Sequence, residues 1–236
     1  MQNIQRKDRL ILALDVDTED EAKKLVLDLR EWVSFFKVGM RLFFRYGPQI
    51  VNSVQRAGGA IFLDAKLHDI PSVVEAAVRV IGRMGVSMVT IHTLGGKDMM
   101  RRAKEAAKEE SPRMKVLGVT LLTSMDDRIL REELGVKESV QEKVLFLALR
   151  AQEAGLDGVV CSGREVRILR ESLGPDFILV VPGIRKEKIE GDEQKRVLTP
   201  TEAIKQGADY LVIGRPILQA SNPATVAKEM ASGFDI

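Results

Sequence analysis

A charged segment with the sequence DAKLHDIP, residues 64–71, directly follows the apolar residues 60–63. The apolar run is typical of a buried strand, in which every second side chain points to the same face. Asp64 and Lys66 therefore share a face with Phe62, and we expect a carboxylate and an ammonium on the interior side of that strand. Burying charges is costly unless they are paired. Asp69 adds a second acid just beyond the lysine. Alternating acidic and basic side chains at the end of a buried strand are not needed for folding. We therefore interpret this pattern as part of a catalytic site.

Short β-rich runs alternate with longer amphipathic segments along the whole chain. The predicted strands are Leu10–Val16, Ser34–Val38, Ala60–Lys66, Ser87–His92, Lys115–Leu122, Asp157–Cys161, Phe177–Val181 and Tyr210–Ile213. The predicted helical segments are Glu19–Trp32, Arg41–Gln55, Ser72–Met84, Asp98–Glu109, Val140–Ala154, Gly163–Ser172, Pro200–Gln206 and Ala224–Ala231. Strands that alternate with helices indicate parallel βαβ units. A series of this length fits an α/β protein, a single (β/α)8 TIM barrel over residues 1–236.

Active sites of such barrels form at the carboxyl ends of the strands. The first three predicted strands bring Asp15, Lys37, Asp64 and Lys66 to that rim, and the fifth ends near Thr123. The alternative interpretation is a structural ion-pair network in the barrel mouth. Four charged side chains from three neighbouring strands favour the functional interpretation.

The loops after the seventh and eighth strands predict a phosphate site, because such sites are common there. These loops offer Gly183, Arg185, Gly214 and Arg215. Glycine lets backbone N–H groups approach an anion, and arginine matches phosphate oxygens with a two-pronged fork. The alternative is that the glycines only turn the chain and the arginines are solvated. The polar segment 184–199 is long for a compact domain, which predicts a mobile, functional loop.

The overall composition excludes several classes of function. There are 36 basic and 34 acidic residues, so no excess of charge favours nucleic acid or an anionic membrane as a partner. The single cysteine, Cys161, excludes an internal disulfide. The first apolar run is too short for a signal peptide or a membrane span, so we expect a cytoplasmic protein. Asp15, Asp64 and Asp69 would suit Mg²⁺ only if the two lysines turned away. His92 is expected to be a hydrogen-bonded core or rim residue.

The charged segment resembles the D-x-K-x-x-D-I-P signature of the orotidine 5'-phosphate decarboxylase family. The resemblance extends in order along the chain, through residues 12–15, 36–39, 122–124, 182–185, 192–196 and 213–217. It implies a (β/α)8 homodimer with shared active sites that converts orotidine 5'-phosphate to UMP and CO2 without metal or organic cofactor. It implies further that Lys66 protonates C6 and Asp64 lies beside the departing carboxylate. Lys37 and Asp69 complete the charged array, with Asp69 reaching into the partner's site.

The same resemblance implies a set of substrate-binding residues. Asp15 and Lys37 would hold the ribose hydroxyls, and Thr123 and Gln194 would lie near the pyrimidine or the phosphate. The complete set is Asp15, Lys37, Asp64, Ala65, Lys66, Leu67, His68, Asp69, Ile70, Pro71, Ser72, Val73, Thr123, Pro182, Arg185, Gln194, Gly214 and Arg215.

Two other functions stay open on the sequence. One is a Mg²⁺-dependent sugar-phosphate decarboxylase or aldol synthase on the same barrel. The other is a catalytically silent, nucleotide-binding barrel with a regulatory role. A silent binder would need the arginines but not Lys66, so the full charged array argues against it.

Overall fold

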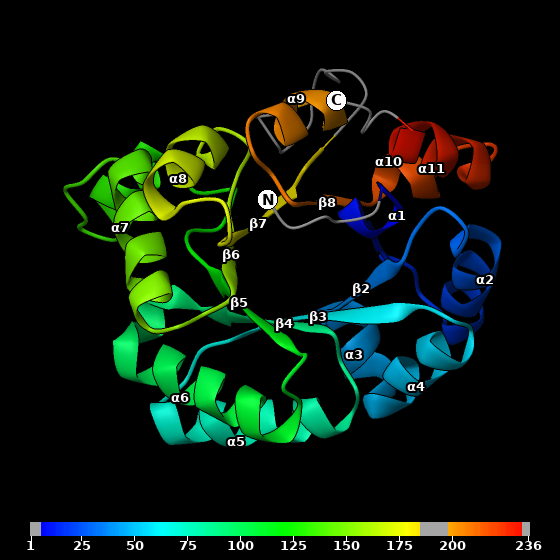
Figure 1. Cartoon of the computed structure of the whole chain (residues 1–236), viewed down its shortest axis with the longest axis horizontal. Helices are drawn as coiled ribbons and strands as arrows, with labels where there is room; N and C mark the ends of the chain where they lie inside the picture. Colours follow the sequence, from blue (N-terminus) through cyan, green and yellow to red (C-terminus); the bar gives the residue numbers. More distant parts are fainter. Residues whose placement is uncertain (1–5, 185–197, 233–236) are drawn as a thin grey trace.

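Eight parallel strands close into a barrel at the centre of the molecule, with each strand paired to the next and β8 paired to β1 (Figure 1). The computed structural model describes residues 6–184 and 198–232. The strands are β1 (Leu10–Ala13), β2 (Phe35–Gly39), β3 (Ala60–Leu67), β4 (Met88–His92), β5 (Lys115–Val119), β6 (Gly158–Val160), β7 (Ile178–Pro182) and β8 (Tyr210–Ile213). The predicted (β/α)8 barrel is therefore confirmed.

Helices surround the barrel and connect its strands (Figure 1). They are α1 (Arg6–Arg9), α2 (Glu19–Leu29), α3 (Met40–Tyr46), α4 (Pro48–Arg56), α5 (Pro71–Arg83), α6 (Gly96–Glu110), α7 (Val140–Glu153), α8 (Val166–Leu173), α9 (Pro200–Lys205), α10 (Arg215–Leu218) and α11 (Pro223–Ser232). Three of them begin with a capping box, in which a Ser or Thr hydroxyl and a Glu three residues on satisfy each other's backbone N–H. These caps are at Thr18, Ser139 and Thr199.

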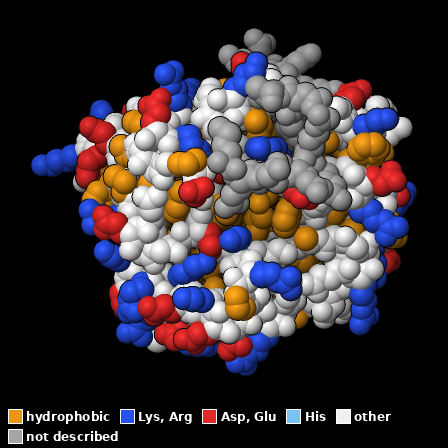
Figure 2. Space-filling view, in the orientation of Figure 1, with side chains coloured by type: hydrophobic (Ala, Val, Ile, Leu, Met, Phe, Trp, Pro, Cys, Tyr) orange, Lys and Arg blue, Asp and Glu red, His pale blue; other side chains and the backbone are white. Residues whose placement is uncertain are grey.

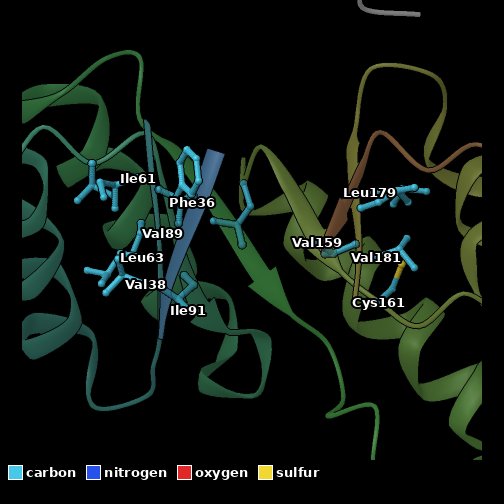
Figure 3. Close-up of a cluster of buried hydrophobic side chains, with 14 of the residues drawn as sticks. Phe36, Val38, Ile61, Leu63, Val89, Ile91, Val159, Cys161, Leu179 and Val181 are labelled. Carbon is cyan, nitrogen blue, oxygen red and sulfur yellow. The ribbon is translucent and has the colours of Figure 1, made fainter. Parts of the chain in front are cut away.

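The apolar side chains form two cores, as the alternation of a strand requires. The outward faces of the strands pack under the helices, where Figure 3 shows Phe36, Val38 and Ile61 among the buried side chains. The inward faces fill the barrel itself. This interior cluster consists of Ile11, Ala13, Phe62, Met88, Leu117, Ile178, Val180, Tyr210 and Val212.

Several predicted boundaries were wrong for identifiable reasons. The predicted helix 41–55 is two helices, because Gly47 has a φ of 57° and Pro48 starts α4. The first strand ends at Ala13 rather than Val16, and the fifth ends at Val119 rather than Leu122. In both cases residues shortly after the strand line the cavity at the barrel mouth, among them Asp15 after β1 and Leu121, Leu122 and Thr123 after β5.

The surface fits the balanced composition. On the face shown in Figure 2, basic and acidic side chains intermingle around the edge of the molecule. None of the helices in the described part of the chain has both the length and the apolar character needed to cross a membrane.

Candidate active site

The interior faces of three neighbouring strands change from apolar to polar toward their carboxyl ends. Lys37 lies two residues after Phe35 on β2, Asp64 two after Phe62 on β3, and Thr90 two after Met88 on β4. Because side chains alternate along a strand, each polar group stands above an apolar one in the barrel. The polar side chains at the carboxyl ends of the strands thus lie directly above the packed apolar interior of the barrel.

Asp64 is the centre of the charged array. Its Oδ2 lies 2.7 Å from the Lys66 Nζ and 3.4 Å from the Lys37 Nζ. Lys37 is also 3.8 Å from the more exposed Asp15. The side chains of Asp64 and Lys37 are each only 14% exposed, so this is a desolvated array rather than a surface pair. The four predicted charged residues of strands one to three therefore converge.

The backbone around Lys66 is irregular. The pairing of β3 with β4 shifts register between Leu63 and Leu67, and Lys66 has a φ of 47°. A left-handed conformation is uncommon for a residue with a side chain and marks a site whose surroundings enforce it. The predicted shared interior face of Asp64 and Lys66 is nevertheless borne out, since both line the cavity with Phe62 while Ala65 and Leu67 pack against the outer core.

Thr90 completes the array, and sequence reasoning missed it. Its hydroxyl donates to Asp64 Oδ1 at 3.0 Å and accepts the backbone N–H of Lys66 at 2.9 Å. Burial opposes the ionisation of Asp64. The charges of Lys37 and Lys66 and the hydrogen bonds from Lys66 and Thr90 outweigh that effect, so the pKa of Asp64 is lowered. The signal in the sequence was a hydroxyl on the interior face of a buried strand.

The array lines a cavity of about 280 Å³ at the carboxyl ends of the strands. Polar residues meet an apolar wall that the sequence did not identify, which includes Val119, Leu121, Val160 and Val212. The predicted residues that line the cavity are Asp15, Lys37, Asp64, Lys66, Thr123, Pro182, Gly183, Gly214 and Arg215. The cavity is thus lined by both charged and apolar side chains, which suits a small molecule with polar and apolar surface.

The two glycines of the rim have a structural reason to be glycine. Gly183 has a φ of 79°, in the left-handed region that favours glycine. A Cβ on Gly214 would lie 3.3 Å from Asp15 Oδ2 and 3.4 Å from the Ala13 Cβ. The backbone at Gly214 therefore passes close to the charged array, and Arg215 follows it at the same rim.

Other predicted residues do not line this cavity within the described chain. Asp69 is exposed, and its carboxylate accepts the neighbouring N–H of Ile70 at 2.6 Å. The remaining members of this group are Ala65, Leu67, His68, Ile70, Pro71, Ser72 and Val73, in or just after β3. Arg185, Gln194 and most of the predicted loop 184–199 lie outside the described residues.

His92 corrects one expectation. It lies 5.4 Å from His68, ring centre to ring centre. Its Nδ1 is buried and has no hydrogen-bond partner within the described residues, so the predicted hydrogen-bonded histidine is not fully satisfied. Burial, His68 and Lys66 together lower the pKa of His92. The described residues also contain no cluster of three or more His, Cys, Asp or Glu side chains suited to a metal ion.

The fold and the cavity together define a class of protein. A carboxylate held between two lysines at the mouth of a (β/α)8 barrel is an arrangement for stabilising charge that develops on a small bound molecule. The molecule is thus a barrel enzyme whose candidate site lies at the carboxyl ends of the strands.

Comparisons with known proteins identify the family. The model of the orotidine 5'-phosphate decarboxylase / HUMPS family matches residues 8–230. An orotidine 5'-phosphate decarboxylase of Moorella thermoacetica is 44% identical over 98% of this chain and 93% of its own, and one of Carboxydothermus hydrogenoformans is 47% identical over 94% of both. The crystal structure of orotidine 5'-phosphate decarboxylase from Lactobacillus acidophilus superposes with a TM-score of 0.87 at 37% identity, covering 97% of this chain and 100% of the other. The chain belongs to this family, as its sequence motifs predicted.

Proposed function

We propose that this chain decarboxylates orotidine 5'-phosphate to UMP and CO2, the last step of UMP biosynthesis, in the cytoplasm and without a metal or organic cofactor. The observation that carries the proposal is the Lys66 ammonium, held 2.7 Å from Asp64 on the wall of the cavity. The names of the relatives supply the substrate and the reaction.

The reaction breaks the bond between C6 and the carboxylate carbon. The electron pair stays on C6, in the plane of the ring, where the π system cannot delocalise it. A fixed ammonium stabilises this charge and then gives its proton to C6, which completes UMP. Lys66 fits this role because Asp64 fixes its direction. Asp64, whose pKa is lowered, is a carboxylate that would repel the substrate's own carboxylate and favour its departure.

The remaining residues would hold the parts of the nucleotide that do not react. We assign the ribose hydroxyls to Asp15 and Lys37, and the phosphate to Gly214, Arg215 and Arg185. Thr123, Pro182 and Gln194 would contact the pyrimidine or the phosphate. Closure of the segment 184–199 on the phosphate would let the binding energy of the phosphate, which does not react, lower the barrier for decarboxylation at C6.

A Mg²⁺-dependent reaction is the competing function, and the lysines argue against it. Mg²⁺ binds oxygen ligands, but Oδ2 of Asp64 already contacts Lys66 and Lys37. Purified protein mixed with orotidine 5'-phosphate should remove the orotate absorbance and yield one UMP per substrate, equally with and without EDTA. Loss of activity in EDTA that Mg²⁺ restores would support the competing function. UMP binding without any turnover would support the silent binder.

We also propose a homodimer that shares its active sites. Met40, Ile70 and Leu94 lie within three residues of the ends of β2, β3 and β4 and are 51%, 63% and 45% exposed. Adjacent exposed apolar side chains at one rim are typical of an interface. Asp69 precedes Ile70, is exposed and does not line its own cavity, which supports a role for it in a neighbouring subunit.

A further inference from the structure

We propose that Thr90 is a positioning residue that orients both members of the Asp64–Lys66 pair, an inference that rests on the proposed function. Thr90 is 0% exposed, lies in β4 and does not line the cavity. It acts through other groups, because its hydroxyl contacts the Asp64 carboxylate and the Lys66 backbone but no open space.

The irregular part of β3 needs this hydroxyl. Leu63 pairs with Val89 and Leu67 with Ile91, so four steps along β3 face two steps along β4. Within this stretch the Lys66 N–H bonds to a side chain, the Thr90 oxygen, at 2.9 Å. A buried N–H without a partner is costly, so the hydroxyl stabilises the conformation in which Lys66 has a φ of 47°.

The same hydroxyl fixes the direction of the Asp64 carboxylate. A backbone N–H can only donate, so the hydroxyl accepts from Lys66 and its single hydrogen remains for Asp64 Oδ1, 3.0 Å away. Oδ2 is then directed at Lys66 and Lys37. The Thr90 side chain therefore fixes the backbone from which Lys66 extends. It also determines that Oδ2 of Asp64 is the oxygen that contacts the Lys66 ammonium.

Thr120 provides a matched control. It is also a threonine with 0% exposure, and its hydroxyl donates to the carbonyl oxygen of Val160 at 3.2 Å. It follows β5 and does not line the cavity. Thr120→Val thus removes one buried hydroxyl from the same barrel without touching the charged array.

The test compares two matched pairs, Thr90 with Thr90→Val and Thr90→Ser with Thr90→Ala, so that each pair differs mainly by the hydroxyl. We expect loss of the hydroxyl to lower kcat by about 10- to 100-fold, the scale of a lost hydrogen bond to a charged group. The dissociation constant of UMP should change by less than about threefold, since Thr90 does not line the cavity. Thr90→Ser should keep most of the activity. The kcat of Thr120→Val should stay within about threefold of wild type.

A second readout does not depend on turnover. The pKa of Asp64, followed by carboxyl ¹³C NMR and assigned with Asp64→Asn, should rise when the hydroxyl that favours its ionised form is removed. The other ionisable groups of this region are Asp15, Lys37, Lys66, His68 and His92, and all of them are unchanged in the Thr90 and Thr120 variants. An unchanged Asp64 pKa, an unchanged kcat, or an equal loss in Thr120→Val would overturn the proposal. If wild type itself does not decarboxylate, the proposed function fails, and the Asp64 pKa alone decides whether Thr90 positions the pair.

Discussion

Replacing Lys66 by alanine removes one ammonium from the cavity wall and leaves the rest of the array in place. The Lys66 Nζ is 2.7 Å from Asp64, and its side chain is 28% exposed. Asp64 would keep Lys37 at 3.4 Å and the Thr90 hydroxyl at 3.0 Å, so no carboxylate is left buried without a partner. We therefore expect Lys66→Ala to fold and to bind UMP.

The expected loss of activity follows from two separate contributions of Lys66. Removing a positioned group that stabilises transition-state charge typically costs about 10²- to 10³-fold. Removing a general acid costs about 10²- to 10⁴-fold. If the two contributions multiply, kcat falls by at least about 10⁴-fold.

The measurement is the rate at which orotate absorbance disappears, with UMP affinity measured by calorimetry on the same preparation. Lys115→Ala is the control, because Lys115 begins β5 at the opposite end of the barrel and contacts Asp157 at 3.5 Å. It should retain wild-type turnover. Activity of Lys66→Ala within tenfold of wild type would refute the role of Lys66 as proton donor.

Three further outcomes are expected. Arg215→Ala should weaken UMP binding by about 2 kcal/mol, the scale of a hydrogen bond to a charged group, but leave binding of uridine unchanged; an equal loss for both ligands would make Arg215 structural. When the inactive variants Lys66→Ala and Asp69→Ala are mixed and exchange subunits, about a quarter of wild-type activity should return, because half the dimers are hybrids with one intact site. If subunits exchange and no activity returns, Asp69 acts in its own subunit's site. Burial raises the pKa of the Cys161 thiol, so this cysteine should resist thiol reagents at pH 8 until urea unfolds the chain, and rapid labelling of the native protein would contradict its burial.

The barrel could be predicted from the sequence because each strand is a short apolar run between amphipathic segments. The eighth strand, Tyr210–Ile213, matches its prediction at both ends. Errors arose where apolar residues continue past the ladder, as at Leu121, which is 6% exposed although it follows β5. The break at Gly47 was readable, since a glycine before a proline seldom continues a helix.

The charged array was predictable in membership but not in geometry. Strand alternation accounts for Lys37 and Asp64, which follow Phe35 and Phe62 at the two-residue spacing of one strand face. The same spacing places Lys66 on the cavity side, as the structure has it, but it does not predict the φ of 47° or the register shift beside it.

A register shift depends on the neighbouring strand, so no pattern within residues 60–67 encodes it alone. The irregular backbone at Lys66 is stabilised by the hydroxyl of Thr90 on β4, and the residues around Thr90 in that strand have the apolar pattern of an ordinary core strand. This explains why the motif DAKLHDIP does not specify the array by itself. Asp64 and Lys66 supply the charges, whereas Thr90, more than twenty residues away, links the bent backbone of one to the carboxylate of the other. The two charged groups are close together in the sequence, but their orientation depends on the pairing of β3 with β4 in the closed sheet.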